Sequence, residues 1–157
     1  MILVPRHPKR MKEISSQIDN FKFKYSIRSQ NQTLEKDTQI YLADTIGELP
    51  LWYSSCSITF IAGSLLPIGG HTPYEPTLYS SAIIHGQYFS NFEEIYDELD
   101  KNRGALKVTN PKELAAAWEK LKIVKFREQT LSEAKSILLK VDEKEKLINS
   151  IIYKLKP

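Results

Sequence analysis

The sequence predicts an α/β protein with a doubly wound parallel sheet of about six strands and extra helices at its carboxyl-terminal end. Three observations carry this prediction. Short apolar runs alternate with segments of helical periodicity over residues 1–125, which is the pattern of strand–helix–strand units. Two of these runs, 57–62 and 82–85, lack the polar alternation of a half-exposed strand, as expected when helices cover both faces of a sheet. The charged stretch 126–157 is helical in period and lacks a strand pattern.

Each apolar run and each periodic segment defines one expected element. Strands are expected at residues 2–4, 21–27, 39–43, 57–62, 82–85 and 105–108. Helices are expected at residues 8–19, 47–55, 76–81, 91–99 and 111–121. In the first helix, Met11, Ile14 and Ile18 recur on one face. Asn91 and Asn110 precede the last two helices and are expected to cap them.

The carboxyl-terminal stretch is expected to form two helices with a break near residues 141–144. Apolar residues recur there at helical spacing: Ile137, Leu138, Val141, Leu147, Ile148, Ile151 and Ile152. We therefore predict a binding domain over residues 1–125 and a helical extension over residues 126–157.

Composition excludes several classes of protein. With 157 residues and 41% hydrophobic content, the chain can bury the core of one domain. A net charge of +3 is too small to indicate a nucleic-acid partner. The single cysteine, Cys56, excludes an internal disulfide and a cysteine-based zinc site. The sequence contains no run of 18 apolar residues, so we expect no membrane span. It contains no Gly-x-Gly-x-x-Gly or Walker motif, so we expect no cofactor. His71 and Glu75 lie four residues apart without a third ligand nearby, so we expect no metal.

Polar and glycine-containing segments follow four of the expected strands. These segments are residues 5–8, residues 44–49, residues 63–64 with 69–76, and residue 86 with 91–92. Ligands of open α/β sheets bind outside the carboxyl ends of the strands, where these segments come together. The sequence therefore predicts a binding site at this edge of the sheet.

Several residues of these segments have side chains suited to a ligand. Arg6, between two prolines, suits a phosphate or a carboxylate, and a surface ion pair is the equal alternative. Thr45 and Glu48 have the spacing of a capping box, which favours a structural role for Glu48. Gly47, in the first turn of the expected helix, indicates either a closely approaching ligand or close helix packing.

The segment 69–76 carries the most specific pattern. We expect Pro76 at the first position of a helix and Glu75 as its N-cap. Because Glu is a poor N-cap, its carboxylate is expected to accept the hydroxyls of a ribose. His71 is interpreted as a polar anchor of the loop rather than a metal ligand. His85 is interpreted as a satisfied core or rim histidine rather than a catalyst.

These segments together resemble the 3-deoxy-D-manno-octulosonic acid (Kdo) transferase family over residues 2–125. The resemblance rests on Val4-Pro5-Arg6-His7-Pro8, Ala43-Asp44-Thr45-Ile46-Gly47-Glu48-Leu49, Ile61-Ala62-Gly63-Ser64-Leu65, Gly69-Gly70-His71-Thr72-Pro73-Tyr74-Glu75-Pro76 and Asn91-Phe92. The Gly-Gly-His-x-Pro-x-Glu-Pro element is its specific part.

The resemblance implies a B-type glycosyltransferase with two Rossmann-like domains. Such an enzyme transfers Kdo from CMP-Kdo to lipid A precursor at the cytoplasmic face of the bacterial inner membrane. This chain resembles the carboxyl-terminal, donor-binding half. The amino-terminal half carries the membrane anchor, the acceptor site and the general base, so no catalytic residue is expected here. The position of Met1 before a strand that begins mid-fold predicts an excised domain or a split gene product.

The resemblance also implies the donor-binding residues. They are Arg6, His7, Thr45, Gly47, Glu48, Gly63, Ser64, Gly69, Gly70, His71, Glu75 and Asn91. Two alternatives stay open at this point. One is the donor-binding domain of another nucleotide-sugar glycosyltransferase or an epimerase. The other is a non-catalytic α/β binding or signalling module, for which Asp44 is the one candidate phosphoacceptor and lacks acidic partners.

Overall fold

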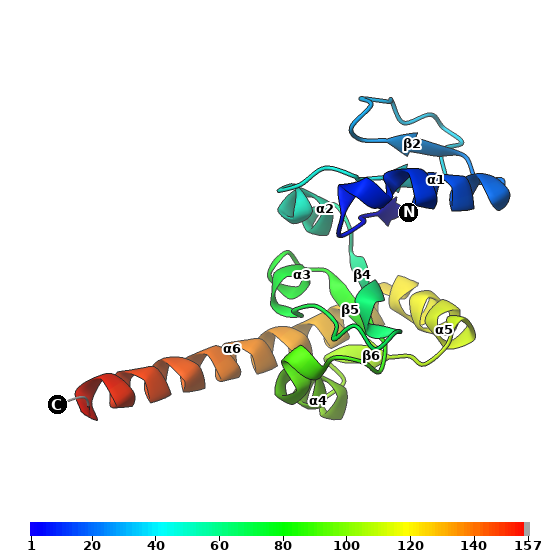
Figure 1. The fold of residues 1–157 in the computed structure, drawn as a ribbon. Coiled ribbons are helices and arrows are strands. Elements are labelled where there is room, and N and C mark those ends of the chain that lie inside the picture. Colours follow the sequence, from blue (N-terminus) through cyan, green and yellow to red (C-terminus); the bar gives the residue numbers. More distant parts are fainter. Residues whose placement is uncertain (156–157) are drawn as a thin grey trace. The chain divides into compact units, whose positions relative to one another are not determined.

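The computed structural model describes the backbone of residues 1–155 and the side chains of residues 1–142. The chain forms two compact units, Met1–Trp52 and Tyr53–Pro157, and each is described by itself. The predicted α/β class is confirmed, because the described residues contain six strands and every strand pair is parallel. The strands are hydrogen-bonded as two sheets of three (Figure 1), where the sequence predicted a single sheet.

The first unit is built on the sheet order β1-β3-β2. Its strands are β1 (Ile2–Leu3), β2 (Tyr25–Ile27) and β3 (Ile40–Leu42), and its helices are a 3₁₀ helix (Pro8–Arg10), α1 (Met11–Asn20) and α2 (Leu49–Ser54), in which the boundary between the units falls. Leu42 of the central strand is buried, as are Ile27 of β2 and Ile18 of α1. Of the apolar face predicted for the first helix, Ile18 is buried in the core, whereas Met11 and Ile14 are half-buried.

The second unit is built on the sheet order β4-β5-β6. Its strands are β4 (Ile58–Ile61), β5 (Ala82–His85) and β6 (Ala105–Lys107). Its helices are 3₁₀ helices at Ala62–Ser64 and Ser90–Phe92, and α3 (Tyr74–Leu78), α4 (Glu93–Lys101), α5 (Pro111–Lys122) and α6 (Val124–Leu155). All four residues of the central strand β5 are buried. This explains its continuous apolar sequence, because helices cover both faces.

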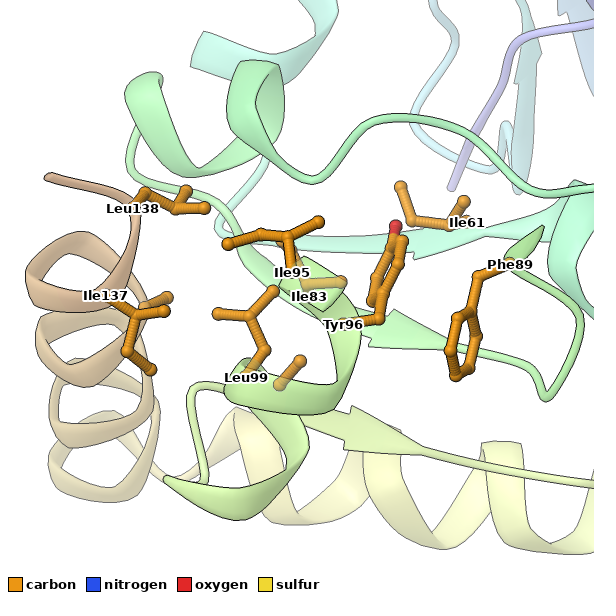
Figure 2. Packing of buried hydrophobic residues seen from close by; sticks show 10 residues of the cluster. Ile61, Ile83, Phe89, Ile95, Tyr96, Leu99, Ile137 and Leu138 are labelled. Carbon is orange, nitrogen blue, oxygen red and sulfur yellow. The ribbon is translucent and has the colours of Figure 1, made fainter. Parts of the chain in front are cut away.

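Alternate residues of β5 point into two separate cores. Ile83 joins the core formed with α4 and α6, which Figure 2 shows from close by; its members are Ile61, Ile83, Phe89, Ile95, Tyr96, Leu99, Ala105, Ala134, Ile137 and Leu138. Ala82 and Ile84 join the opposite core, where Ala117 and Leu121 of α5 pack. Helices on both faces of this sheet, as the sequence predicted, are therefore confirmed (Figure 1).

Three local predictions were wrong. α6 is one continuous helix through the break expected near residues 141–144. α3 begins at Tyr74, so Pro76 is the third helical residue rather than the first. Pro76 is tolerated there because the first four N–H groups of a helix have no intrahelical partner. Phe92 occupies the N-cap position of α4, whereas Asn91 lies within the preceding 3₁₀ helix.

Other predictions were confirmed or stay open. Asn110 caps α5, where its side-chain oxygen accepts a hydrogen bond from the Glu113 amide at 3.0 Å. Of the apolar residues predicted to face the core from the last helix, Ile137 and Leu138 are buried. Leu147, Ile148, Ile151 and Ile152 lie outside the residues whose side chains are described. The division into residues 1–125 and 126–157 stays a prediction.

Candidate functional site

The loops after β4 and β5 are joined by hydrogen bonds to Ser64. Its buried hydroxyl donates to the Ile61 carbonyl and accepts a 2.6 Å hydrogen bond from the Gly86 amide. The Ser64 carbonyl accepts a second bond from the Tyr88 amide at 2.9 Å. Gly86 must lack a side chain, because a Cβ there would lie 2.1 Å from the Ser64 carbonyl oxygen. Ser64, a predicted donor contact, therefore uses its hydroxyl to hold the carboxyl edge of this sheet together.

Residues 69–71 form a segment that we call the glycine loop. Gly69 and Gly70 have φ angles of +98° and +70°, which L-residues with side chains rarely adopt. A Cβ on Gly69 would lie 2.8 Å from the Asn91 side-chain nitrogen, and one on Gly70 would lie 3.1 Å from the Tyr88 carbonyl oxygen. The glycines therefore allow the loop to turn while its backbone lies directly against the segment after β5.

His71 completes the glycine loop and is exposed, while its carbonyl is tied to the core. The Tyr96 hydroxyl of α4 donates to that carbonyl at 2.7 Å. Gly63 lies beneath the imidazole ring, because a Cβ at Gly63 would be 3.6 Å from a His71 ring carbon. Of the predicted residues in the second unit, the structure thus brings together Gly63 with His71 and Gly69 with Asn91.

Glu75 lies in the first turn of α3 and is exposed. The predicted N-cap role for Glu75 is wrong, because Pro73 occupies that position and Thr72 accepts a 3.3 Å bond from the Tyr74 amide. Burial raises the pKa of the nearby Tyr53 phenol, and the negative charge of Glu75 raises it further. A carboxylate in the first turn is favoured by the helix dipole, so Glu75 remains suited to accepting hydroxyl groups.

His85, at the end of β5, is fully buried, as a structural histidine should be. Its Nδ1 lies 2.7 Å from the Gly86 carbonyl oxygen and its Nε2 lies 2.8 Å from an Asp100 carboxylate oxygen. The second Asp100 oxygen lies 3.6 Å from the Lys107 ammonium. Because both imidazole nitrogens already have partners, His85 has a structural place in the core, which confirms the interpretation made from the sequence.

A hollow of about 420 Å³ opens at the carboxyl edge of this sheet. Gly69, Gln87 and Ser90 contribute to its wall, together with Glu93 and Lys107. Of the glycine loop, Gly69 lines this open, polar depression.

In the first unit, Arg28 and Glu48 form an ion pair where β2 and β3 end. Arg28 Nε and Nη2 donate to the two Glu48 oxygens at 3.1 and 2.8 Å, and the Thr45 hydroxyl also donates to Glu48. These hydrogen bonds, that from Arg28 above all, lower the pKa of Glu48. Glu48 is therefore held structurally, as the sequence favoured, although by a side-chain network rather than a capping box.

Asp44 and Gly47 of the first unit also have structural explanations. The buried Asp44 carboxylate accepts from the Ser29 amide at 2.9 Å and from its hydroxyl at 2.7 Å. Gly47 has φ +87°, and a Cβ there would meet no atom of the described residues within 4 Å. Its conformation therefore requires glycine, whereas the close helix packing considered from the sequence does not occur at this position.

Arg6 and His7 are exposed in the segment after β1. Arg6 belongs to one compact unit and Glu75 to the other, so their sharing of a ligand stays a prediction. The donor-binding roles inferred for all twelve residues above likewise stay predictions.

Sequence reasoning missed Arg28 and Tyr96. Arg28 lies in a segment read as a polar loop, and nothing in the sequence pairs it with Glu48, twenty residues away. Tyr96 lies on the buried face of an amphipathic helix, where periodicity indicates burial but not the partner of its hydroxyl.

Membrane-spanning helices and metal-binding clusters are both absent from the described residues. These residues contain no helix long and apolar enough to cross a membrane. They also contain no group of three or more His, Cys, Asp or Glu side chains arranged to hold a metal ion.

Comparison with known proteins relates this chain to one enzyme family, although no family model matches it. The chain is 38% identical over 110 residues to the 3-deoxy-D-manno-octulosonic acid transferase of Haemophilus influenzae, covering 70% of this chain and 26% of that protein. It is 30% identical to the transferase of Rickettsia typhi over 164 residues, covering 100% of this chain and 34% of that protein. The chain thus spans 34% of the length of one of these curated relatives and 26% of the other.

Two further similarities concern a bifunctional protein and a solved structure. The chain is 33% identical over 155 residues to a bifunctional glycosyltransferase/methyltransferase of Fusobacterium nucleatum, covering 94% of this chain and 24% of that protein. Among solved structures, it resembles the C-terminal CMP-Kdo binding domain of WaaA from Acinetobacter baumannii, with a TM-score of 0.83 and 34% identity. This similarity covers 87% of this chain and 72% of that domain. The chain therefore belongs to the 3-deoxy-D-manno-octulosonic acid transferase family, in which it corresponds to the C-terminal domain.

Proposed function

We propose that this chain binds CMP-Kdo as the donor half of a Kdo transferase of lipopolysaccharide synthesis. The observation that carries the proposal is the similarity in both sequence and fold to the CMP-Kdo binding domain from Acinetobacter baumannii. The predicted donor-binding residues of the second unit follow β4 and β5, where ligands of parallel sheets bind. The geometry of the glycine loop, with its exposed His71, supports the same assignment.

The chemistry of the donor matches the groups available in the second unit. CMP-Kdo carries a phosphodiester, a sugar carboxylate and a ribose with two hydroxyls. The glycine loop turns at Gly69 and Gly70 and presents the exposed His71, whose imidazole can donate a hydrogen bond to the phosphate. The Glu75 carboxylate accepts the ribose hydroxyls in this proposal. Donors aimed at the phosphate stabilise CMP as it leaves the anomeric carbon.

The proposal assigns no catalytic residue to this chain. The general base, the acceptor site for lipid A precursor and the membrane anchor belong to an amino-terminal domain of the kind that the family resemblance implies. The reaction then takes place at the cytoplasmic side of the inner membrane. In this division of labour the chain supplies donor binding and leaving-group stabilisation, without cofactor or metal.

The experiment that tests the proposal is saturation-transfer NMR on the whole chain with CMP, UDP and GDP. We expect signal transfer to CMP and much weaker transfer to the other two. A preference for UDP or GDP contradicts the assignment of CMP-Kdo.

The ribose contact is tested separately with Glu75→Gln. The variant is expected to weaken CMP binding by about tenfold, because a charge-assisted hydrogen bond is lost. Glu94→Gln, which changes an exposed glutamate of α4, is the matched control and should bind CMP like the unaltered chain. Equal CMP affinity of the Glu75 variant and the control rules out the ribose role.

A second candidate is the donor-binding domain of a glycosyltransferase that uses another activated sugar. It corresponds to the similarity, over 94% of this chain, to a bifunctional glycosyltransferase/methyltransferase whose name specifies no donor sugar. The same NMR experiment separates the two, because the second candidate predicts a base preference other than cytosine.

A further inference from the structure

The Tyr96 hydroxyl makes a long-range contact to the glycine loop. The Tyr96 side chain is buried, with 0% of its surface exposed, and a buried phenol needs a hydrogen-bond partner. That partner is the His71 carbonyl, 2.7 Å away and 25 residues earlier in the chain. Figure 2 shows the hydroxyl pointing away from α4 toward Ile61, with the ring beside Phe89. Burial, with smaller effects of Tyr53 and Asp100, raises the pKa of Tyr96 far above its usual value, so the hydroxyl keeps its proton and donates.

The aromatic neighbours hold the Tyr96 ring in one place. Its centroid lies 4.5 Å from that of His85 and 5.0 Å from that of Phe89. His85 is itself fixed at both nitrogens by the Gly86 carbonyl and by Asp100 of α4. The end of β5 and the helix α4 therefore form a rigid platform under the ring. A hydroxyl on such a platform defines the position of its acceptor.

The acceptor lies at the point where the glycine loop passes into α3. Two of the three loop residues are glycines at positive φ, so the loop has few side chains of its own to anchor it. Immediately after His71, Thr72 accepts from the Tyr74 amide and Pro73 is buried at the start of α3, the helix that carries Glu75. The bond from Tyr96 thus fixes the peptide between His71 and Thr72.

We propose that Tyr96 is a positioning residue for the donor, because its hydroxyl holds the glycine loop in the conformation that meets the nucleotide. Tyr96 lies within the core and acts through His71. The inference rests on the proposed function for the identity of the ligand. It adds a residue of the hydrophobic core to the determinants of donor affinity.

The test is Tyr96→Phe in the whole chain, with Tyr25→Phe as the control. Tyr25 also presents a hydroxyl to a partner, Asp19 at 3.4 Å, but belongs to the other compact unit. Loss of one neutral hydrogen bond predicts CMP binding weaker by roughly five- to tenfold in Tyr96→Phe, measured by titration calorimetry. We also expect faster hydrogen exchange at the Tyr74 amide, which donates to the Thr72 hydroxyl at 3.3 Å, and shifted NMR signals for Gly69 and Gly70. The control should match the unaltered chain in all three measurements.

The outcomes separate the two proposals. If the unaltered chain fails to bind CMP, the proposed function fails, and hydrogen exchange at the Tyr74 amide still tests whether Tyr96 holds the loop. If the chain binds CMP and Tyr96→Phe binds it within twofold of the unaltered affinity, the positioning role is overturned while the function stands. Unchanged exchange at the Tyr74 amide in the variant overturns the positioning role in either case.

Discussion

At the scale of single residues, the Glu48 carboxylate links folding to pH. Its pKa is lowered by the hydrogen bonds from Arg28 first and Thr45 second. An unfolded Glu titrates near pH ~4.3, so the ionised form is favoured in the folded chain. Its contribution to stability is complete above that unfolded pKa and is lost as the pH falls through the lower folded pKa. We expect Glu48→Gln to be less stable than the unaltered chain near neutral pH and to lose less stability on acidification.

Thermal unfolding followed between about pH 7 and pH 3 measures this effect. Glu119→Gln is the control, because Glu119 pairs with Lys122 at 2.9 Å on an exposed helix surface, where ion pairs contribute little. Parallel stability curves for Glu48→Gln and the unaltered chain over this range would contradict the link to pH.

Three glycines predict a graded series of alanine variants. Gly47 has positive φ with open space around it, so Gly47→Ala should cost about 1 kcal/mol in unfolding free energy from strain alone. Gly70 combines positive φ with a Cβ position 3.1 Å from the Tyr88 carbonyl, so its variant should cost more. Gly86→Ala should cost about 3 kcal/mol or more, because the clash is with backbone.

Urea denaturation of the three variants gives the order directly. The series is contradicted if Gly47→Ala proves as destabilising as Gly86→Ala.

At the scale of elements, the last helix presents two neighbouring leucines with opposite roles. Leu138 is 7% exposed and packs in the core beneath α4, whereas Leu139 is 64% exposed. We expect Leu138→Ala to lower the unfolding free energy by about 2–4 kcal/mol, through lost burial and a residual cavity. Leu139→Ala should change it by less than about 0.5 kcal/mol. Chemical denaturation of both variants checks this, and similar losses would mean that α6 does not pack on the face described.

The two asparagines before α4 and α5 allow a second comparison of alanine variants. Asn110 accepts a hydrogen bond from the Glu113 amide, so Asn110→Ala should cost about 1 kcal/mol in unfolding free energy. Asn91 lies within the 3₁₀ helix that precedes α4, so Asn91→Ala should cost less than half as much. Thermal unfolding measures both, and an equal loss would restore the capping role that the sequence predicted for Asn91.

The sequence predicts element type well and side-chain partnership poorly. Each strand of the described residues lies within a range that the sequence predicts, from an apolar run or, for the edge strand β2, from alternating apolar and polar residues. The expected break in the last helix is absent because the charged residues 142–145 are good helix formers, and polarity alone does not end a helix. The hydrogen bonds from Arg28 to Glu48 and from Tyr96 to His71 join residues far apart in sequence. Hydrophobic periodicity cannot predict such partners.

At the scale of the whole molecule, the proposed division of labour predicts binding without turnover. The chain spans 34% or less of the length of the curated relatives compared above. Incubated with CMP-Kdo and lipid A precursor, it should release no CMP above the uncatalysed rate, because no general base is assigned to it. Chromatography of the nucleotide products measures this. Transfer of Kdo by the chain alone would show that a catalytic residue has been overlooked.

The hydrogen bond and close backbone contact between Ser64 and Gly86 have an evolutionary consequence. Replacing Ser64 by alanine leaves the buried Gly86 amide without its hydrogen-bond acceptor. Any side chain at Gly86 collides with the backbone of Ser64. Because that clash is with main-chain atoms, Gly86 should be retained in divergent sequences whatever residue occupies position 64, whereas position 64 should keep a side-chain acceptor for the Gly86 amide.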